Sequence, residues 1–249
     1  MRSTILAHKV AIAVQCRLSS RRLPCKALLP FGDTVLINFL LRRLRTCLPD
    51  TPIFILTSTQ YEDKLLTSYI DPEFTVFRGS LENVLARYVD FSSLYRVEAI
   101  VRVTGDNPFT DPGMITQLIN SLSYSQPYNT YAQESVLEGC NSEIFTRQAL
   151  NELFTSHPSA EDLEHVTTSL RLFNRSRLVY RSRFSSDFVS DYSLTVDTFQ
   201  DYLRCHRILD YLFDKSILAL SISHDDILQV ISEIKDFPTG RSHPVGELP

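Results

Sequence analysis

Glycine is scarce in this sequence, with 7 residues in 249, whereas glycine makes up about 7% of an average protein. This shortage excludes glycine-rich repeats. No stretch approaches the roughly 18 uninterrupted apolar residues of a membrane span. Positive charge is not in excess either, because 25 Lys and Arg stand against 29 Asp and Glu, for a net charge of −4. Sequence-independent nucleic-acid binding needs a basic field, so we expect neither a nucleic acid nor a membrane as partner.

Cysteine patterns with a known chemistry are also missing. The 5 cysteines include no C-x-x-C pair and no Cys/His cluster at zinc spacing, which favours free thiols in a reducing cytoplasm. The first nine residues have no long apolar core before Lys9, so we expect no signal peptide. The length suits one domain with an appendage. We therefore predict a cytoplasmic protein in which residues 1–249 form a single domain.

The first half of the sequence alternates short apolar segments with longer amphipathic ones. Strands are predicted at Val10–Val14, Ile53–Leu56, Thr75–Phe77 and Ala99–Val103. Helices are predicted at 35–48 with Asp33 or Thr34 as cap, at 62–69, after a capping Ser80, and from Asp111-Pro112 onward. Strands separated by such helices imply right-handed crossovers. The predicted fold class is therefore α/β, a mainly parallel sheet with helices on both faces.

The second half is less regular. We interpret the segment of about 124–190 as an insertion within the domain that contacts a partner subunit, and its polar first part, 124–139, predicts irregular or edge-strand structure. Helices are predicted near 147–154, 162–172, 199–213 and 225–234, and strands at 178–183 and 193–196. A loose tail is expected over 236–249.

A basic loop follows the first predicted strand, at the sheet edge where α/β proteins bind ligands. Four cations fall within residues 17–26. Arg17, Arg22 and Lys26 could neutralise phosphate oxygens while backbone N–H groups converge on the same anion. The loop lacks the G-x-x-x-x-G-K-[ST] pattern of a Walker P-loop. A solvated basic turn is the alternative, and the position of the loop after a strand favours the phosphate site.

Six motifs, in order along the chain, resemble those of the sugar-acid cytidylyltransferases. They are RLSSRRLPCK at 17–26, FRGSLENVLARY at 77–88, VRVTGDNP at 101–108, GCNSEIF at 139–145, EHVT at 164–167 and LTVDTFQD at 194–201. The family includes the CMP-Kdo and CMP-sialate synthetases, and the sequence looks most like the SpsF-like spore coat polysaccharide branch. The resemblance implies a Rossmann-like, GT-A-like nucleotidyltransferase fold of three layers, and a homodimer.

The resemblance also implies a reaction, in which CTP and a nonulosonic or octulosonic type of sugar acid give a CMP-sugar and pyrophosphate for surface polysaccharide biosynthesis. A sugar hydroxyl attacks the α-phosphorus, so catalysis needs cations and alignment more than a covalent nucleophile. The implied cofactor is Mg²⁺, which prefers hard oxygen ligands. The family pattern makes Asp106 and Asp197 its ligands, and makes the catalytic residues Arg17, Arg22, Lys26 and Asp106.

Both acidic residues also have structural interpretations. Asp106 could be a turn aspartate before Pro108, and Asp197 could cap the helix that follows it. Thr198 and Asp201 form the better capping pair, which leaves Asp197 available for the metal.

A further group of residues is expected to bind the nucleotide or the sugar: Gln15, Ser20, Thr57, Ser58, Arg78, Gly79, Ser80, Arg102, Gly105 and Glu143. A simple N-cap is the alternative for Ser80, and an ordinary polar loop for Thr57 and Ser58. For Arg87, inside a predicted helix, a surface salt bridge and a contact with substrate both stay open. Arg102 lies on a strand and is costly to bury unpaired, so we expect it to face the site or a carboxylate.

The sequence departs from the family pattern at Cys25, which replaces a glycine. A cysteine is strained there if the position has positive φ. His165 matches the family's second half and could contact the sugar, although a structural or dimer-contact role is commoner for such a histidine. Two rival hypotheses stay open. One is a catalytically weak nucleotide-binding or scaffold homologue, and the other is a related nucleotidyltransferase with a different nucleotide or acceptor.

Overall fold

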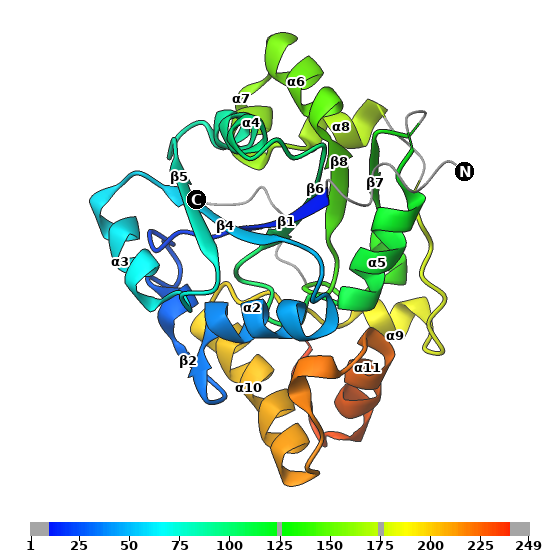
Figure 1. Ribbon diagram of the computed structural model, residues 1–249. Helices are drawn as coiled ribbons and strands as arrows, with labels where there is room; N and C mark the ends of the chain where they lie inside the picture. Colours follow the sequence, from blue (N-terminus) through cyan, green and yellow to red (C-terminus); the bar gives the residue numbers. More distant parts are fainter. Residues whose placement is uncertain (1–9, 124–125, 174–176, 240–249) are drawn as a thin grey trace, which may run out of the picture.

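A six-stranded sheet forms the centre of the computed structural model, which describes residues 10–123, 126–173 and 177–239 (Figure 1). The strand order is β5-β4-β1-β6-β8-β7. These strands are β1 (Val10–Gln15), β4 (Ile53–Ser58), β5 (Thr75–Gly79), β6 (Ala99–Thr104), β7 (Tyr128–Thr130) and β8 (Glu143–Thr146). The first four in the sheet order run parallel, whereas β8 is antiparallel to both of its neighbours. The prediction of a mainly parallel sheet is confirmed.

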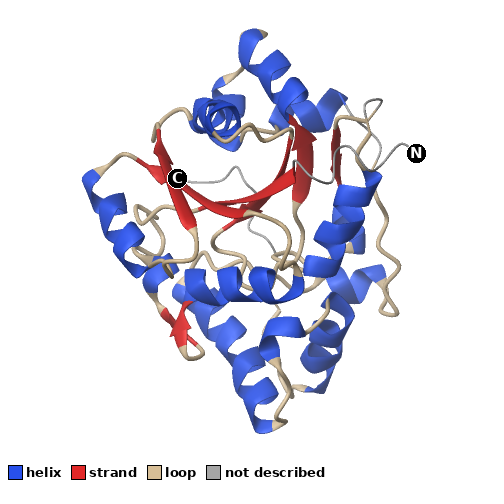
Figure 2. Ribbon diagram, viewed as in Figure 1, coloured by secondary structure: helices blue, strands red, loops and turns tan. Residues whose placement is uncertain are grey.

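Helices cover both faces of this sheet (Figure 2). One side carries α2 (Leu36–Cys47), α5 (Pro112–Ser121), α10 (Phe199–Asp214) and α11 (His224–Glu233), and the other carries α4 (Val84–Leu94), α6 (Arg147–Thr155), α7 (Ala160–His165) and α8 (Thr168–Phe173). The remaining described elements are α3 (Tyr61–Tyr69), α9 (Ser186–Ser190), the 3-10 helices η1 (Lys26–Leu28), η2 (Gln133–Ser135) and η3 (Ala219–Ser221), and the hairpin of β2 (Pro30–Phe31) and β3 (Thr34–Val35). Within the described residues, no helix has the length and apolar character needed to cross a bilayer.

Alternation along the central strand builds a separate apolar core on each face. Ile12 and Val14 of β1 pack in the core that includes α2, whereas Ala11 and Ala13 pack in the core that includes α4. Because successive side chains of a strand point to opposite faces, Gln15 at the end of β1 lies on the α4 face. The Gln15 side chain therefore lies at the carboxyl end of β1, on the same face of the sheet as the core that includes α4.

The elements of the first half were predicted correctly, but two helix caps were wrong. Helix α2 begins after Val35 and has no side-chain cap. The residues just before the helix, Thr34 and Val35, pair as β3 with β2. Helix α4 is capped by Asn83, whose side chain accepts from the Ala86 N–H. Ser80 instead accepts from the Asn83 N–H and supports the turn that leads into the helix.

Several predictions for the second half were also wrong. Residues 178–183 and 193–196 form no strand, and each segment makes a single isolated bridge, one to Tyr131 and one to Glu138. The predicted helix 162–172 is broken in two by Val166, which has a φ of 67°. The edge strand expected within 124–139 is present as β7, whereas β8, which joins it to β6, was not predicted. Through these two strands the second half joins the main sheet. The predictions for residues 1–9 and 240–249 lie outside the described residues.

Candidate active site

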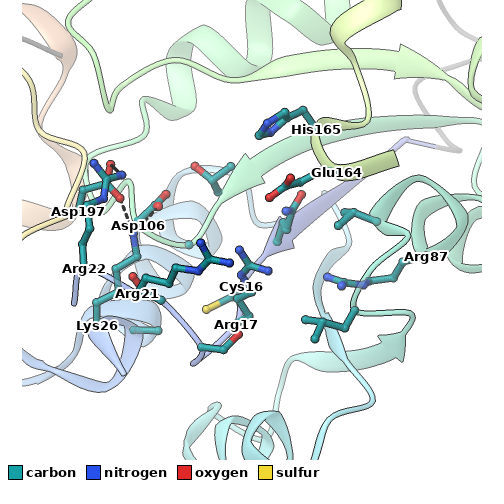
Figure 3. Close-up of a pocket in the computed structure, with 18 of the residues that line it drawn as sticks. Cys16, Arg17, Arg21, Arg22, Lys26, Arg87, Asp106, Glu164, His165 and Asp197 are labelled. Atoms are coloured by element: carbon teal, nitrogen blue, oxygen red, sulfur yellow. Dashed lines mark hydrogen bonds and ion pairs between the residues drawn. The ribbon is translucent and has the colours of Figure 1, made fainter. Parts of the chain in front are cut away.

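A cavity of about 800 Å³ opens at the carboxyl ends of β1 and β6 (Figure 3). Its walls come from the loop after β1, the loop after β6, the start of α4, the end of α7 and the segment before α10. At what we call the ion-pair end lie Arg22, Lys26, Asp106 and Asp197. The opposite end, called the α4/α7 end, is lined by Leu81, Glu82, Val84, Arg87, Glu164 and His165.

The basic loop between β1 and η1 is anchored from below by a buried carboxylate. Asp63, in the first turn of α3, accepts a hydrogen bond from the Leu18 N–H at 2.7 Å and another from the Ser58 hydroxyl. Both carboxylate oxygens are thereby satisfied in a side chain that is almost fully buried. The anchor holds the loop backbone, and its cations Arg17, Arg21 and Arg22 line the cavity.

Lys26 lies between two carboxylates at the ion-pair end. Its Nζ is 2.7 Å from Asp106 Oδ2 and 3.0 Å from Asp197 Oδ1, and it also donates to the Val196 carbonyl at 2.7 Å. Arg22 pairs with the second oxygen of Asp197 at 2.7 Å. Burial lowers the pKa of Lys26, but the two carboxylates outweigh burial and raise it. Burial likewise raises the pKa of Asp106, and Lys26 outweighs that effect and lowers it. Both groups are therefore charged at neutral pH.

Asp197 reaches this place although the segment before it is not a strand. The Val196 N–H donates to the Asp106 carbonyl at 2.8 Å, which docks the segment against the loop after β6. Thr198 and Asp201 form a reciprocal capping box for α10, as predicted. Because this pair caps the helix, the Asp197 carboxylate is left to face Lys26. Gly139, at a φ of 90°, packs so closely on Leu194 and Thr195 that no side chain fits there.

Gly105 is required for close packing beneath the site. A Cβ at this position would lie 2.9 Å from the Cβ of Cys16, which belongs to the loop after β1. The Gly105 N–H donates to the Gln15 carbonyl at 2.8 Å, so the ends of β1 and β6 stay side by side. Gln15, Ser20 and Gly105 all line the cavity, as do Arg17, Arg22, Lys26, Asp106 and Asp197.

Seven of the residues predicted to bind ligand do not line the cavity, and five of them hold the strand ends and the turn around it. Thr57 and Ser58 are fully buried at the end of β4. Arg78 donates to the carbonyls of Ser58 and Gln60 and so ties β5 to the loop after β4. The remaining two hold the turn before α4: a Cβ at Gly79 would meet the Cγ of Arg87 at 2.7 Å, and the Ser80 carbonyl accepts from the Arg87 guanidinium. Arg87 is itself buried, so of its two interpretations the surface salt bridge was wrong, and a contact with substrate stays a prediction because Arg87 lines the cavity.

Arg102 and Glu143 are paired beneath the cavity rather than in its wall. They occupy directly opposite positions on β6 and β8, and Arg102 Nη1 donates to Glu143 Oε1. Glu143 also accepts from Arg171 of α8 and from the Tyr128 hydroxyl. The expectation that Arg102 faces a carboxylate is confirmed, and the predicted contact of Glu143 with ligand finds no support in its position.

Some cavity residues were not in the predicted set. Arg21, Leu81 and Glu82 lie within the recognised motifs, so their proximity to a site residue was the available indication. Glu164 was missed, whereas His165 was weighed both as a sugar contact and as a structural residue; both point toward the cavity from the end of α7 (Figure 3). Both belong to the EHVT motif at 164–167, which was the available indication in the sequence.

The carboxylates of Asp106 and Asp197 are suited to a divalent ion. They converge on one cation, Lys26 Nζ, and carboxylate oxygens with substrate phosphates are the usual ligands of Mg²⁺. Among the described residues, no group of three or more His, Cys, Asp or Glu side chains could hold a metal without such a substrate. The donor set therefore fits an ion that arrives with a polyphosphate.

A mainly parallel sheet that carries a basic loop and one carboxylate at its strand ends, with a second carboxylate brought beside them from the segment before α10, is the arrangement of a nucleotidyltransferase. The family model described as Cytidylyltransferase matches residues 11–240, and the chain belongs to this family. It is 28% identical over 243 residues to the spore coat polysaccharide biosynthesis protein SpsF of Bacillus subtilis, covering 94% of this chain and 98% of that one. An uncharacterized protein of Methanocaldococcus jannaschii is 32% identical over 160 residues, 64% of this chain and 65% of that protein, which is less than two thirds.

Solved structures support the same assignment. A cytidylyltransferase from Leptospira borgpetersenii superposes with a TM-score of 0.81 at 27% identity, covering 94% of this chain and 98% of that one. A CMP:2-keto-3-deoxy-manno-octonic acid synthetase complexed with CTP superposes with a TM-score of 0.56 at 15% identity, covering 84% of this chain and all of the other, and shows the shared fold. The predicted family and nucleotidyltransferase fold are confirmed.

Proposed function

We propose that this cytidylyltransferase activates a sugar acid for surface polysaccharide biosynthesis. A hydroxyl oxygen of the sugar acid forms a bond to the α-phosphorus of CTP, the bond from that phosphorus to the bridging oxygen breaks, and pyrophosphate leaves. The hydroxyl proton is lost to solvent or buffer. The names of the SpsF relative and of the CMP-sugar-acid synthetase support this substrate class.

The observation that carries the proposal is the cluster at the ion-pair end. Lys26 bridges Asp106 and Asp197, and three arginines of the same loop line the cavity beside it. Repulsion between a nucleophilic oxygen and a triphosphate is the main barrier to attack, and fixed cations reduce it. Arg17, Arg22 and Lys26 would bind the phosphates and stabilise charge on the departing pyrophosphate.

Asp106 and Asp197 would hold Mg²⁺ together with the triphosphate. A bound Mg²⁺ supplies additional positive charge to the phosphate oxygens. When the ion is bound, Lys26 can turn from the carboxylates to a phosphate, because its Nζ is a flexible donor on a long stem.

The α4/α7 end would accept the sugar acid. Glu82, Glu164 and His165 offer hydrogen-bonding groups to sugar hydroxyls, and Leu81 and Val84 offer apolar contact. A homodimer built through the segment of about 124–190 and a cytoplasmic location belong to the same proposal.

One observation favours the rival hypothesis of a weak nucleotide-binding homologue. Cys25 has a φ of 58°, in the left-handed region that glycine adopts without strain, and it lies directly before Lys26. Strain at this position would affect the loop that the reaction depends on.

The test is to incubate the protein with CTP, Mg²⁺ and a panel of nonulosonic and octulosonic acids, and to measure pyrophosphate. Release with CTP and one class of acid, but not with UTP, GTP or ATP, is the expected result. Release with another nucleotide or a sugar phosphate would identify a related transferase. No release with any acid, together with no CTP-dependent shift in melting temperature, would favour the scaffold.

A further inference from the structure

Gln15 is a polar side chain at the end of the central strand. Its backbone pairs with Leu56 of β4 and with Thr104 of β6, so its position is fixed by the sheet. The side chain lies on the α4 face, where it lines the cavity and approaches Tyr88 of α4. A rigid backbone on both sides makes this residue suited to orienting a ligand.

The chemistry of its neighbours fixes which end of the Gln15 amide faces the cavity. Arg102 Nε donates to Gln15 Oε1 at 3.2 Å, and the Tyr88 hydroxyl donates to the same oxygen at 3.4 Å. Arginine has no acceptor, so the amide oxygen must face it. Burial raises the pKa of Tyr88 to about 12, which keeps its hydroxyl protonated. Among the described residues, the Gln15 amide nitrogen Nε2 makes no hydrogen bond.

Arg102 cannot turn away from this role, because its other contact is a buried ion pair. It donates to Glu143, which also accepts from Arg171 at 2.8 Å and from the Tyr128 hydroxyl at 2.8 Å. Burial alone would raise the pKa of Glu143, but the two guanidinium groups outweigh it and lower the pKa to about 2. A chain of charge-assisted contacts therefore runs from α8 through β8 and β6 to the end of β1.

We propose that Gln15 determines specificity by donating a hydrogen bond from Nε2 to a carbonyl-type oxygen of the substrate, and that Arg102 and Glu143 are positioning residues that keep this donor turned to the cavity. The inference rests on the proposed function and deepens it. Two groups of the substrates carry such an oxygen: the carbonyl of the cytosine base and the carboxylate of the sugar acid.

The test uses Gln15→Glu, which keeps the shape and still accepts from Arg102 but presents an oxygen to the cavity instead of an N–H. CTP affinity is measured by titration calorimetry, and KM for the reactive acid by pyrophosphate release. We expect a loss of about tenfold or more in one of the two, with KM changing more than kcat. A loss in CTP affinity assigns the base carbonyl, and a loss confined to the acid assigns its carboxylate. Unchanged values for both overturn the proposal.

Two controls protect this result. Gln60→Glu makes the same chemical change at an exposed position outside the cavity and should alter neither quantity. Gln15→Met removes the donor without adding charge, and it replaces Gln15→Glu if that variant fails to fold. If the wild type binds CTP but releases no pyrophosphate with any acid, the proposed function fails, and CTP affinity alone decides the role of Gln15.

The positioning role is tested by a double-mutant cycle. Glu143→Gln should raise the same KM that Gln15→Glu raises, by about three- to tenfold, because Arg102 loses its anchor. Combined with Gln15→Glu, it should add little further loss, since the donor it positions is already absent. Additive losses would show that Glu143 acts only on the fold and would overturn this part of the proposal.

Discussion

The two sides of the cavity are built on different physical principles. At the ion-pair end the charged groups come from outside the strands, and the outer pair is exposed, with the side chain of Arg22 54% accessible and that of Asp197 33% accessible. The inner pair is less so, with Asp106 at 24% and Lys26 at 12%. On the α4 face the ion pair of Arg102 and Glu143 lies within the sheet, at 10% and 6%. Exposed pairs contribute little to stability and can exchange partners, whereas a buried pair holds one arrangement.

This difference assigns separate tasks to the two sides. Exchangeable cations and carboxylates suit a triphosphate and its metal, which must enter and leave in each turnover. A fixed network suits recognition, because a donor held in one orientation distinguishes an acceptor from a donor on the ligand. Substitutions at the ion-pair end should therefore lower kcat with little effect on the fold, whereas those in the network should lower stability or raise a substrate KM with little effect on kcat.

The largest effect is expected at Asp106. Asp106→Ala should reduce kcat by at least about a thousandfold, because it removes a carboxylate from the proposed metal site and leaves Lys26 with one partner. The measurement is pyrophosphate release with CTP, Mg²⁺ and the reactive acid. Asp50→Ala, at an exposed position, serves as control. Full activity in the Asp106 variant would show that the metal assignment is wrong.

Glu143→Gln should have its main effect on stability. Removing the charge leaves Arg102 buried with a weakened partner, at a cost of about 3 kcal/mol in the free energy of unfolding at pH 7. Because the pKa of Glu143 is lowered to about 2 in the fold, its stabilisation is present above the unfolded value near 4.5 and is lost as pH falls toward 2. Urea unfolding should therefore show that the difference in unfolding free energy between wild type and variant is smaller at pH 3.5 than at pH 7.

The exposed Glu152→Gln of α6 is the matched control and should leave the unfolding free energy nearly unchanged at both pH values. If the difference in unfolding free energy between wild type and Glu143→Gln is the same at both pH values, the lowered pKa of Glu143 is contradicted.

Lys26→Ala should lower kcat/KM by about a hundredfold, since the lysine is the cation that contacts both carboxylates. Among the residues that the structure describes, the more exposed Arg22 pairs with Asp197 alone, so Arg22→Ala should lose only about tenfold. Steady-state kinetics over a range of CTP concentrations measures both. Equal losses in kcat/KM would mean that the buried Lys26 and the exposed Arg22 contribute equally to catalysis, which would contradict this prediction.

The smallest effect is expected at Cys25. Cys25→Gly should raise the free energy of unfolding by about 0.5–1 kcal/mol, because relief of the left-handed strain is partly offset by the entropy of glycine in the unfolded chain. Cys25→Ala keeps the Cβ and should give no such gain. Thermal unfolding of the two variants side by side provides the measurement, and a gain in the alanine variant would point to an effect of the thiol instead.

The sequence predicted the first half of the fold well because periodicity there coincides with burial. Strand β1 is apolar over Val10–Val14, and α2 carries one apolar stripe, so each pattern has one interpretation. In the second half, 178–183 and 193–196 have strand-like composition but only one bridge each, and their docking depends on tertiary contacts. The break at Val166 also has no local sign, since valine rarely adopts positive φ.

The site was predicted in part. The positions of Lys26, Asp106 and Asp197 followed from family motifs, and the structure brings them together although up to 171 residues separate them. Glu143 shows the limit of this reasoning: a motif marks a residue but does not say whether it faces a ligand or a buried arginine. The orientation of the Gln15 amide likewise depends on three other elements and cannot be read from local sequence.

A crystal structure of the protein with CTP and Mg²⁺ would be the most direct experiment. We expect the triphosphate to lie against Lys26 and the loop arginines, with the metal bound by Asp106 and Asp197 and with Lys26 released from at least one carboxylate. A triphosphate bound elsewhere, or a metal that contacts neither aspartate, would contradict the assignment of this cavity as the active site.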